Sequence, residues 1–354
     1  MGIDTRAILL VAYAVAYAVA NAAVSRAQAP ARSAPTGTIV ASNMNDNTAT
    51  VLDAATGRVL ATLPTGEGPH EVAISRDGRW AAVSNYGVRG KPGSTITVID
   101  VAGRSVTRTI DLHDYQRPHG MAFLPGDSLL AVTAEVSKAV LLVEFQSGRV
   151  VQTLQTNSRA SHMVAMSANG ERLATANIAD GTVAVIDVKA PESTRLVHVA
   201  AQPEGIAIMP SGSAVWVGSN RDSVVLVVDA DRAAVVDTLR GFGLPYRLAI
   251  SPDSRVAVVT DPAKANVRIF DVASRRERFT IPIARDSLVP TAEIPGSPSP
   301  EGVTISRDSR WAFVTLQGRN RVATIDLERG TIVSIAPTGT WSDGVGYSPL
   351  VRKP

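Results

Sequence analysis

The chain has 354 residues, 45% of them hydrophobic and 19% charged, with a formal net charge of only +3 and no cysteine. Without cysteine it has no disulfide frame, no thiolate zinc site, no CxxCH attachment of haem and no lipobox lipid anchor. The arginines are spread among predicted turns and aromatic residues make up only 5% of the chain, so we expect no nucleic-acid partner.

The first 29 residues have the pattern of an export signal. Arg6 precedes a run of small, mostly apolar residues from Ala7 to Ala23, and two A-x-A cleavage motifs lie in or after this run. The run is shorter than the ~20 residues that a membrane-spanning helix needs. We therefore expect a cleavable signal peptide at 1–29, no membrane span after cleavage, and a periplasmic or secreted mature chain. A retained membrane anchor is the alternative.

A stretch of about ten residues recurs seven times and sets the organisation of the rest. Four of the six spacings between copies are 42 or 43 residues, and the copies start at Pro69, Pro118, Ser161, Pro203, Pro245, Pro300 and Ser342. This period matches the ~40–45 residues of a four-stranded propeller blade and is too long for ankyrin or leucine-rich repeats.

Each unit also contains an alternating apolar run that ends in an acidic residue. These residues are Asp53, Asp100, Glu144, Asp187, Asp229, Asp271 and Asp326. A carboxylate at a strand end can accept hydrogen bonds from the amides of the turn that follows. We interpret these seven residues as structural.

The first complete unit predicts the four strands of one blade, at residues 71–75, 79–85, 95–100 and 105–110. Val, Ile and Thr alternate within these segments and Gly, Asp and Asn separate them, as is typical of strands. The predicted fold is therefore an all-β, seven-bladed β-propeller with four-stranded antiparallel blades.

The two ends of the repeat region complement each other. Residues 38–63 supply three strands with no innermost strand before them, and residues 343–348 supply an innermost strand with nothing after it. Pairing them closes the ring and removes two open sheet edges. We expect a flexible tether at 30–36, one propeller domain at 37–349 and a C-terminal tail at 350–354.

The repeat also carries a resemblance. The segments PHEVAISRDGRWAAVSN and PEGVTISRDSRWAFVTL resemble the repeat of YVTN-type β-propeller proteins, which are related to lactonase-like propellers. The resemblance covers almost all of the expected mature chain and implies the propeller fold. It implies no single activity, because this repeat family includes enzymes, electron-transfer partners and binding proteins.

The residue after each repeat anchor is the main functional candidate. In a propeller the innermost strands line a central channel, so sevenfold rotation gathers equivalent residues at one mouth. Three of the five histidines of the chain occupy this position, three of the other four residues are acidic, and in chain order the set is His70, His119, His162, Glu204, Tyr246, Glu301 and Asp343.

Three interpretations of this set remain open. The cofactor is unknown, but a divalent metal is a candidate, with His70, His119, His162 and Glu204 as its ligands. The same residues with Glu301 could instead act as general acid and base, because histidine titrates near neutral pH. The third interpretation is structural, with polar side chains that simply line a water-filled channel.

Insertions into the regular repeat are expected at the same mouth. They span residues 86–93, 111–117 and 282–299, and insertions on one face of a repeat array commonly mark the binding face. Arg89, Lys91, Arg117 and Arg247 add positive charge there and favour an anionic or carbonyl-bearing ligand. The predicted ligand-binding residues are Tyr246, Arg247, Asp343, Arg117 and Arg89.

The sequence therefore favours an exported binding protein that recognises a small ligand, a metal or a protein partner at the channel mouth. The alternative is a metal-assisted, lactonase-like hydrolase or lyase that uses the same His/Glu cluster. His113, in one of the insertions, is a further candidate for the mouth, whereas His198 is expected on the surface.

Overall fold

The structure is a computed structural model that describes residues 34–289 and 296–351. The predicted signal peptide and part of the insertion at 282–299 lie outside these residues. From Thr36 on, the chain forms one compact unit. In the described residues no helix is long and apolar enough to cross a membrane.

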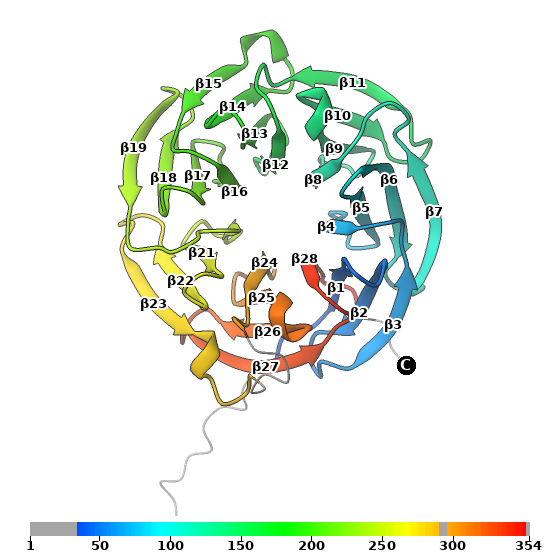
Figure 1. Cartoon of the computed structure of the whole chain (residues 1–354), viewed down its shortest axis with the longest axis vertical. Helices are drawn as coiled ribbons and strands as arrows, with labels where there is room; N and C mark the ends of the chain where they lie inside the picture. Colours follow the sequence, from blue (N-terminus) through cyan, green and yellow to red (C-terminus); the bar gives the residue numbers. More distant parts are fainter. Residues whose placement is uncertain (1–33, 290–295, 352–354) are drawn as a thin grey trace, which may run out of the picture. The chain divides into compact units, whose positions relative to one another are not determined.

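Seven four-stranded antiparallel sheets are arranged in a ring around a central axis, as predicted (Figure 1). The first three blades are β4 (Pro69–Ile74), β5 (Trp80–Val88), β6 (Lys91–Asp100) and β7 (Ser105–Asp111); β8 (Pro118–Phe123), β9 (Leu129–Ala134), β10 (Ala139–Glu144) and β11 (Val150–Gln155); and β12 (Ser161–Met166), β13 (Arg172–Asn177), β14 (Thr182–Asp187) and β15 (Arg195–His198). The next three are β16 (Pro203–Ile208), β17 (Ala214–Ser219), β18 (Val224–Asp229) and β19 (Ala234–Leu239); β20 (Leu248–Ile250), β21 (Val256–Asp261), β22 (Asn266–Asp271) and β23 (Glu277–Pro282); and β24 (Pro300–Ile305), β25 (Trp311–Leu316), β26 (Arg321–Asp326) and β27 (Thr331–Pro337). Short 3-10 helices occupy connections at η1 (Glu135–Ser137), η2 (Pro191–Ser193), η3 (Ile283–Arg285) and η4 (Gln317–Arg319).

The seventh blade contains both ends of the repeat region. Its strand order is β28 (Ser342–Ser348), β1 (Thr38–Asn43), β2 (Thr48–Asp53) and β3 (Val59–Pro64). β1 pairs antiparallel with β28 along its length, which places the first and last strands side by side in Figure 1. The predicted ring closure is confirmed, because β28 supplies the innermost strand that β1, β2 and β3 lack.

The core lies between the faces of neighbouring blades. One cluster joins Ala82 and Val98 of the first blade to Leu130 and Leu141 of the second. Others join adjacent blades in the same way, and Trp216 is almost fully buried against the next sheet. Alternation of apolar and small residues along each strand gives both faces of a blade a neighbour to pack against.

The acidic residues at the strand ends act structurally, as expected. Asp53 accepts the amide of Thr56 at 2.8 Å, and Asp229 accepts two turn amides at 2.9 Å. Six of the seven accept turn amides in this way. Glu144 differs and accepts the hydroxyl of Ser147 at 2.6 Å.

The predicted loop at 86–93 is wrong, because most of it is strand. β5 and β6 continue past a bulge, with Gly87 paired to Pro92 and Val88 paired to Lys91. Gly87 has a φ of +85°, which lets the chain recover the pairing after the bulge. The insertion therefore forms a long hairpin instead of a loose loop.

Inner strands begin with a bulge at the repeat anchor. In the first blade Pro69 pairs with Asn85 but Val72 pairs with Val83, so two residues of β4 lie opposite one residue of β5. Equivalent shifts occur in five other blades. Bulges redirect side chains, and here they redirect the residue after each anchor.

Four blades have glycine as the second bulge residue, at Gly120, Gly205, Gly302 and Gly344. The backbone of the next blade approaches closely at each of them. A Cβ atom on Gly205 would lie 2.2 Å from the carbonyl oxygen of Tyr246. The glycines therefore set the spacing of blades around the channel.

We predict that Gly205→Ala destabilises the propeller by about 1–3 kcal/mol, because the added methyl overlaps backbone of the next blade. Gly103→Ala is the matched control, since its Cβ would meet only the side chain of Asp100, at 3.1 Å or more. Urea unfolding followed by circular dichroism measures both. Equal stability of the two variants would contradict this account of blade spacing.

Candidate functional site

The residues after the anchors form one buried cluster at the channel mouth. His119, His162, Glu204, Glu301 and Asp343 are each no more than 8% exposed, whereas His70 and Tyr246 are half-buried. Contacts among these residues, Glu71 and Arg247 connect blades one to five. Glu301 and Asp343 complete the ring on blades six and seven. The structure thus brings the predicted set together.

The rings of the three histidines contact one another across adjacent blades, His119 and His162 face to face at a tilt and His70 and His119 edge to face. The ring centroids of His119 and His162 are 3.6 Å apart, and those of His70 and His119 are 5.2 Å apart. Nδ1 of His70 lies 2.9 Å from the carbonyl oxygen of Gly68. Tyr86, at a ring distance of 4.5 Å, covers a face of His70.

Arg247 crosses the channel from the fifth blade to the first. Its Nε donates to Oε1 of Glu71 at 2.9 Å, and its Nη1 donates to Oε1 of Glu204 at 2.9 Å. The guanidinium group is 4% exposed and the two carboxylates are 13% and 10% exposed. Blades one and five stand on opposite sides of the ring in Figure 1, so the bridge spans the opening.

Further contacts extend this bridge into a belt around the mouth. Nε2 of His162 is 2.7 Å from Oε1 of Glu204, and Nδ1 of His162 is 3.8 Å from Oε1 of Glu135. The second distance is an ion-pair distance, too long for a hydrogen bond. Tyr86 donates its hydroxyl to Glu135. We define the belt as Tyr86, Glu135, His162, Glu204, Arg247 and Glu71.

The belt fixes the charge of His162 and Glu204. Burial alone would lower the pKa of His162, but the charge of Glu204, its hydrogen bond to His162 and the nearby carboxylate of Glu135 raise this pKa to about 9. Burial would raise the pKa of Glu204, but His162 and Arg247 lower it to about 2. An imidazolium and a carboxylate therefore face each other at neutral pH.

The other two histidines of the mouth are neutral. Burial lowers the pKa of His70 to about 4. Burial, followed by the charge of His162, lowers the pKa of His119 well below its usual value. The Nδ1 atom of His119 is buried without a hydrogen-bond partner.

The two acidic residues on blades six and seven, Glu301 and Asp343, have raised pKa values. Burial raises the pKa of Glu301 to about 7, although Ser299 donates a hydrogen bond to it at 2.6 Å. Burial and the charge of Glu71 raise the pKa of Asp343 well above its usual value. Neither carboxyl has an ion-pair partner within 4 Å among the described residues, and Oδ1 of Asp343 has no hydrogen-bond partner.

Sequence reasoning missed three members of the belt. Glu71 occupies the second bulge position. Four blades have glycine at the equivalent position, and the other three blades have Glu71, Met163 and Arg247 there. This departure from the repeat is a signal that identifies Glu71. Tyr86 and Glu135 come from the second strand and the following connection, where the repeat imposes no residue type.

The positive charge expected at the mouth is largely neutralised. Lys91 pairs with Glu67 at 2.8 Å, and Arg247 is held by two carboxylates. Arg117 stacks over the ring of Tyr86 at 4.6 Å, and Arg89 is exposed in the hairpin turn, where no contact links it to the belt. Arg89 and Arg117 have no carboxylate partner within 4 Å among the described residues, so the anionic ligand stays a prediction that rests on these two residues.

The proposed metal ligands are close together but engaged with other groups. His162 and Glu204 bind each other, and His119 stacks on His162. Within residues 34–289 and 296–351, no three His, Asp or Glu side chains are disposed to hold a metal ion. Binding a metal here would require these side chains to rearrange.

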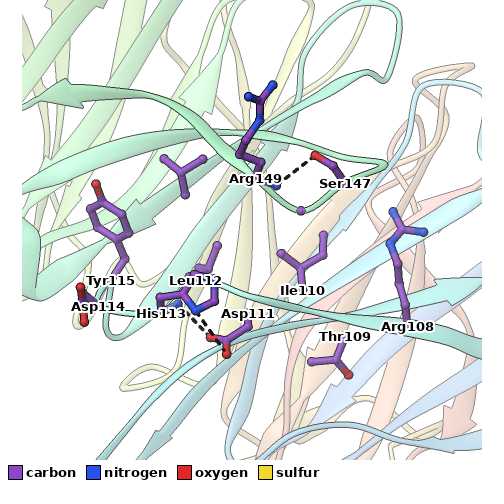
Figure 2. Close-up of a pocket in the computed structure, with 12 residues that line it drawn as sticks. Arg108, Thr109, Ile110, Asp111, Leu112, His113, Asp114, Tyr115, Ser147 and Arg149 are labelled. Carbon is purple, nitrogen blue, oxygen red and sulfur yellow. Dashed lines mark hydrogen bonds and ion pairs between the residues drawn. The ribbon is translucent and has the colours of Figure 1, made fainter.

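A groove of about 600 Å³ lies away from the channel, between β7 and the turn before β11 (Figure 2). His113 lines this groove, and its Nδ1 is 3.6 Å from Oδ2 of Asp111. The groove also contains Arg108, Asp114 and Arg149. His113 thus belongs to the rim of the ring, and His198 is exposed on β15, as expected.

Comparisons with known proteins agree on the fold. The sequence profile described as "Cytochrome D1 heme domain" matches residues 125–347. Hydrazine synthase of Kuenenia stuttgartiensis aligns with a TM-score of 0.63 and 19% identity, over 77% of this chain and 88% of that chain. A functionally unknown protein of Desulfotomaculum acetoxidans DSM 771 aligns with a TM-score of 0.70 and 12% identity, over 88% and 99%. No curated protein matches.

We predict that Arg247→Met destabilises the protein by about 3–5 kcal/mol, because Glu71 and Glu204 lose the charge that compensates their burial. Adding Glu71→Gln should recover part of this loss, since it removes one uncompensated charge. Arg159→Met, which breaks an exposed pair with Asp180, is the control and should change little. Chemical unfolding measures all three. An Arg247→Met protein as stable as the control would show that the bridge is not formed.

We predict a pH dependence that belongs to Glu301. Its pKa is raised from 4.5 to about 7, so between these values the folded chain binds the proton more tightly than the unfolded chain. This carboxyl therefore stabilises the fold at low pH and loses that contribution as pH rises through 7. Compared with Glu301→Gln, the wild type should lose about 3 kcal/mol between roughly pH 4.5 and pH 8. Parallel stability curves of the two proteins would contradict the assignment.

Proposed function

The chain belongs to the cytochrome D1 heme domain family, and on this premise we propose that it is an exported binding propeller. Its ligand is a small molecule rich in hydrogen-bond donors, neutral or cationic, held at the channel mouth. The family and the fold are compatible with binding proteins of several kinds, so the proposal rests on the chemistry of the mouth.

One observation carries this proposal: the mouth contains two buried carboxyl groups that face no cation among the described residues. Oδ1 of Asp343 is buried without a partner, and Glu301 is 7% exposed without a cation beside it. Leaving such groups unsatisfied costs free energy that a ligand with suitable donors would recover. A ligand amine or hydroxyl group meets this requirement.

The belt supports the choice of ligand class. Arg247 and His162 carry the deep positive charges of the mouth, and both are already bound to carboxylates. An anion would have to displace Glu71 or Glu204 to reach them. A donor-rich ligand can instead approach Glu301 and Asp343 from the side of blades six and seven, leaving the belt intact.

The lactonase-like alternative has a narrower basis. It depends on the resemblance to YVTN-type repeats and on Glu301, whose pKa of about 7 suits a general acid. The metal-assisted form requires His70, His119, His162 and Glu204 to release their present contacts. We therefore propose ligand binding as the first candidate function and hydrolysis as the second, with the same residues involved in both.

The family also makes haem a candidate cofactor. The residues at the mouth do not fit it, because ionised side chains bridge the space where a macrocycle would lie. We assign no step to haem in this chain. Export to the periplasm or beyond follows from the predicted signal peptide, and the mouth is also the proposed surface for a protein partner.

We predict that donor-rich probes raise the melting temperature and that carboxylates do not. Ethanolamine, putrescine and glucosamine are compared with acetate and succinate in thermal-shift titrations. A probe present at ten times its Kd would add about 1.4 kcal/mol of stability. For the amines the effect should grow as pH rises through 7, because ionised Glu301 attracts a cation more strongly.

Asp343→Asn tests the location of the probe, because it replaces one carboxyl oxygen by an amide nitrogen and keeps the shape. It should abolish the response to amines, whereas Asp114→Asn, an exposed carboxyl of the insertion at 111–117, should leave it unchanged. Stabilisation by acetate or succinate instead of the amines would refute the proposed ligand class.

A further inference from the structure

We infer that this member of a haem-domain family keeps its channel closed to haem, and that the bridge of Arg247 to Glu71 and Glu204 is what closes it. The inference concerns the family's cofactor and does not depend on the ligand proposed above. It follows from the available iron ligands, from the space at the mouth and from the charges that fill it.

The side chains that could hold haem iron are already engaged. Protein ligands to haem iron are His, Cys, Met or Tyr, and the chain has no cysteine. Nε2 of His162 contacts Glu204 at 2.7 Å. His119 is 1% exposed and lies against His162. Among the three histidines of the mouth, His70 is the most exposed, and its Nε2 is the atom that could reach iron, because its Nδ1 contacts Gly68.

The space in front of His70 is occupied as well. Tyr86 covers the ring at a centroid distance of 4.5 Å, and His119 lies against it at 5.2 Å. Arg247 then crosses from the far side of the channel to Glu71, the residue directly after His70. A flat macrocycle coordinated by His70 would have to lie through this bridge.

The charges at the mouth oppose haem for a second reason. Ligand pockets are mostly apolar with a few polar groups, whereas this opening contains a guanidinium and two carboxylates that are at most 13% exposed. Inserting a macrocycle would separate these ions and leave them buried without partners, which is strongly unfavourable. The bridge therefore excludes haem both by volume and by charge.

Two sequence positions create this bridge. Glu71 and Arg247 replace the glycine found at Gly120, Gly205, Gly302 and Gly344 in other blades. Glycine at both positions would leave the channel without either charged group. The closed channel is thus a property of this chain's own residues within the family fold.

Hemin titration followed by visible absorption tests the inference on the full mature chain. Wild-type protein should show no saturable shift of the hemin absorption band, and protein purified from its native host should contain no stoichiometric iron. Saturable binding by the wild type that His70→Ala or His119→Ala abolishes would overturn the inference. Hemin binding that survives in both variants occurs outside the channel, and this result would support the inference.

The double variant Arg247→Ala/Glu71→Ala tests the bridge itself, because it removes two of the three ions together with most of the volume of their side chains. It should bind hemin roughly ten-fold more tightly than the wild type, or more, and lose this binding when His70 is also replaced by alanine. A folded double variant, checked by circular dichroism, that binds no better than the wild type would show that the bridge is not the barrier. Amine binding at Asp343 is measured separately, so failure of one proposal is distinguishable from failure of the other.

Discussion

The contact of Arg247 with Glu71 and Glu204 is the constraint on which the rest of the mouth depends. It joins residues 176 positions apart in the chain, and it can form only when the first and fifth blades face each other across a closed ring. Buried ion pairs contribute little net stability compared with apolar packing, but removing one partner is costly. The bridge therefore specifies the arrangement of the blades more than it adds to their stability.

The bridge also divides the mouth into two electrostatic halves. On blades two to four, the positive charges of Arg247 and His162 hold Glu204 ionised. On blades six and seven, Glu301 and Asp343 receive too little of this charge to offset their burial, and the pKa of each is raised. Groups of one chemical type thus differ in protonation because Glu204 contacts two cations, whereas Glu301 and Asp343 contact none among the described residues.

The repeat period predicted most of the fold, and the reason is geometric. Seven copies of one pattern determine the blade number, and the incomplete units at the two ends determine how β28 and β1 pair. Strand limits were less accurate, since the hairpin formed by β5 and β6 depends on a bulge at Gly87 that no alternation reveals. The repeat period describes only what the blades share, so it cannot predict a feature that occurs in a single blade.

The candidate site, too, was predictable only at positions that all blades share. The residue after each anchor was identified, because every blade has one at the same place. Glu71, Tyr86 and Glu135 were not, since the belt draws them from positions that are polar in one blade only. The pairing of Arg247 was missed for a related reason: the sequence shows Arg247 but not the two carboxylates that it meets after folding.

The protonation of the three histidines at the mouth reports most directly on this account. Nitrogen-15 NMR of histidine-labelled protein near neutral pH distinguishes rings that carry one proton from rings that carry two. The account predicts that His162 alone carries both protons, because its pKa is about 9, and that His70 and His119 are neutral. Three neutral rings, or three that titrate together near their ordinary pKa, would contradict the belt and with it the bridge across the channel.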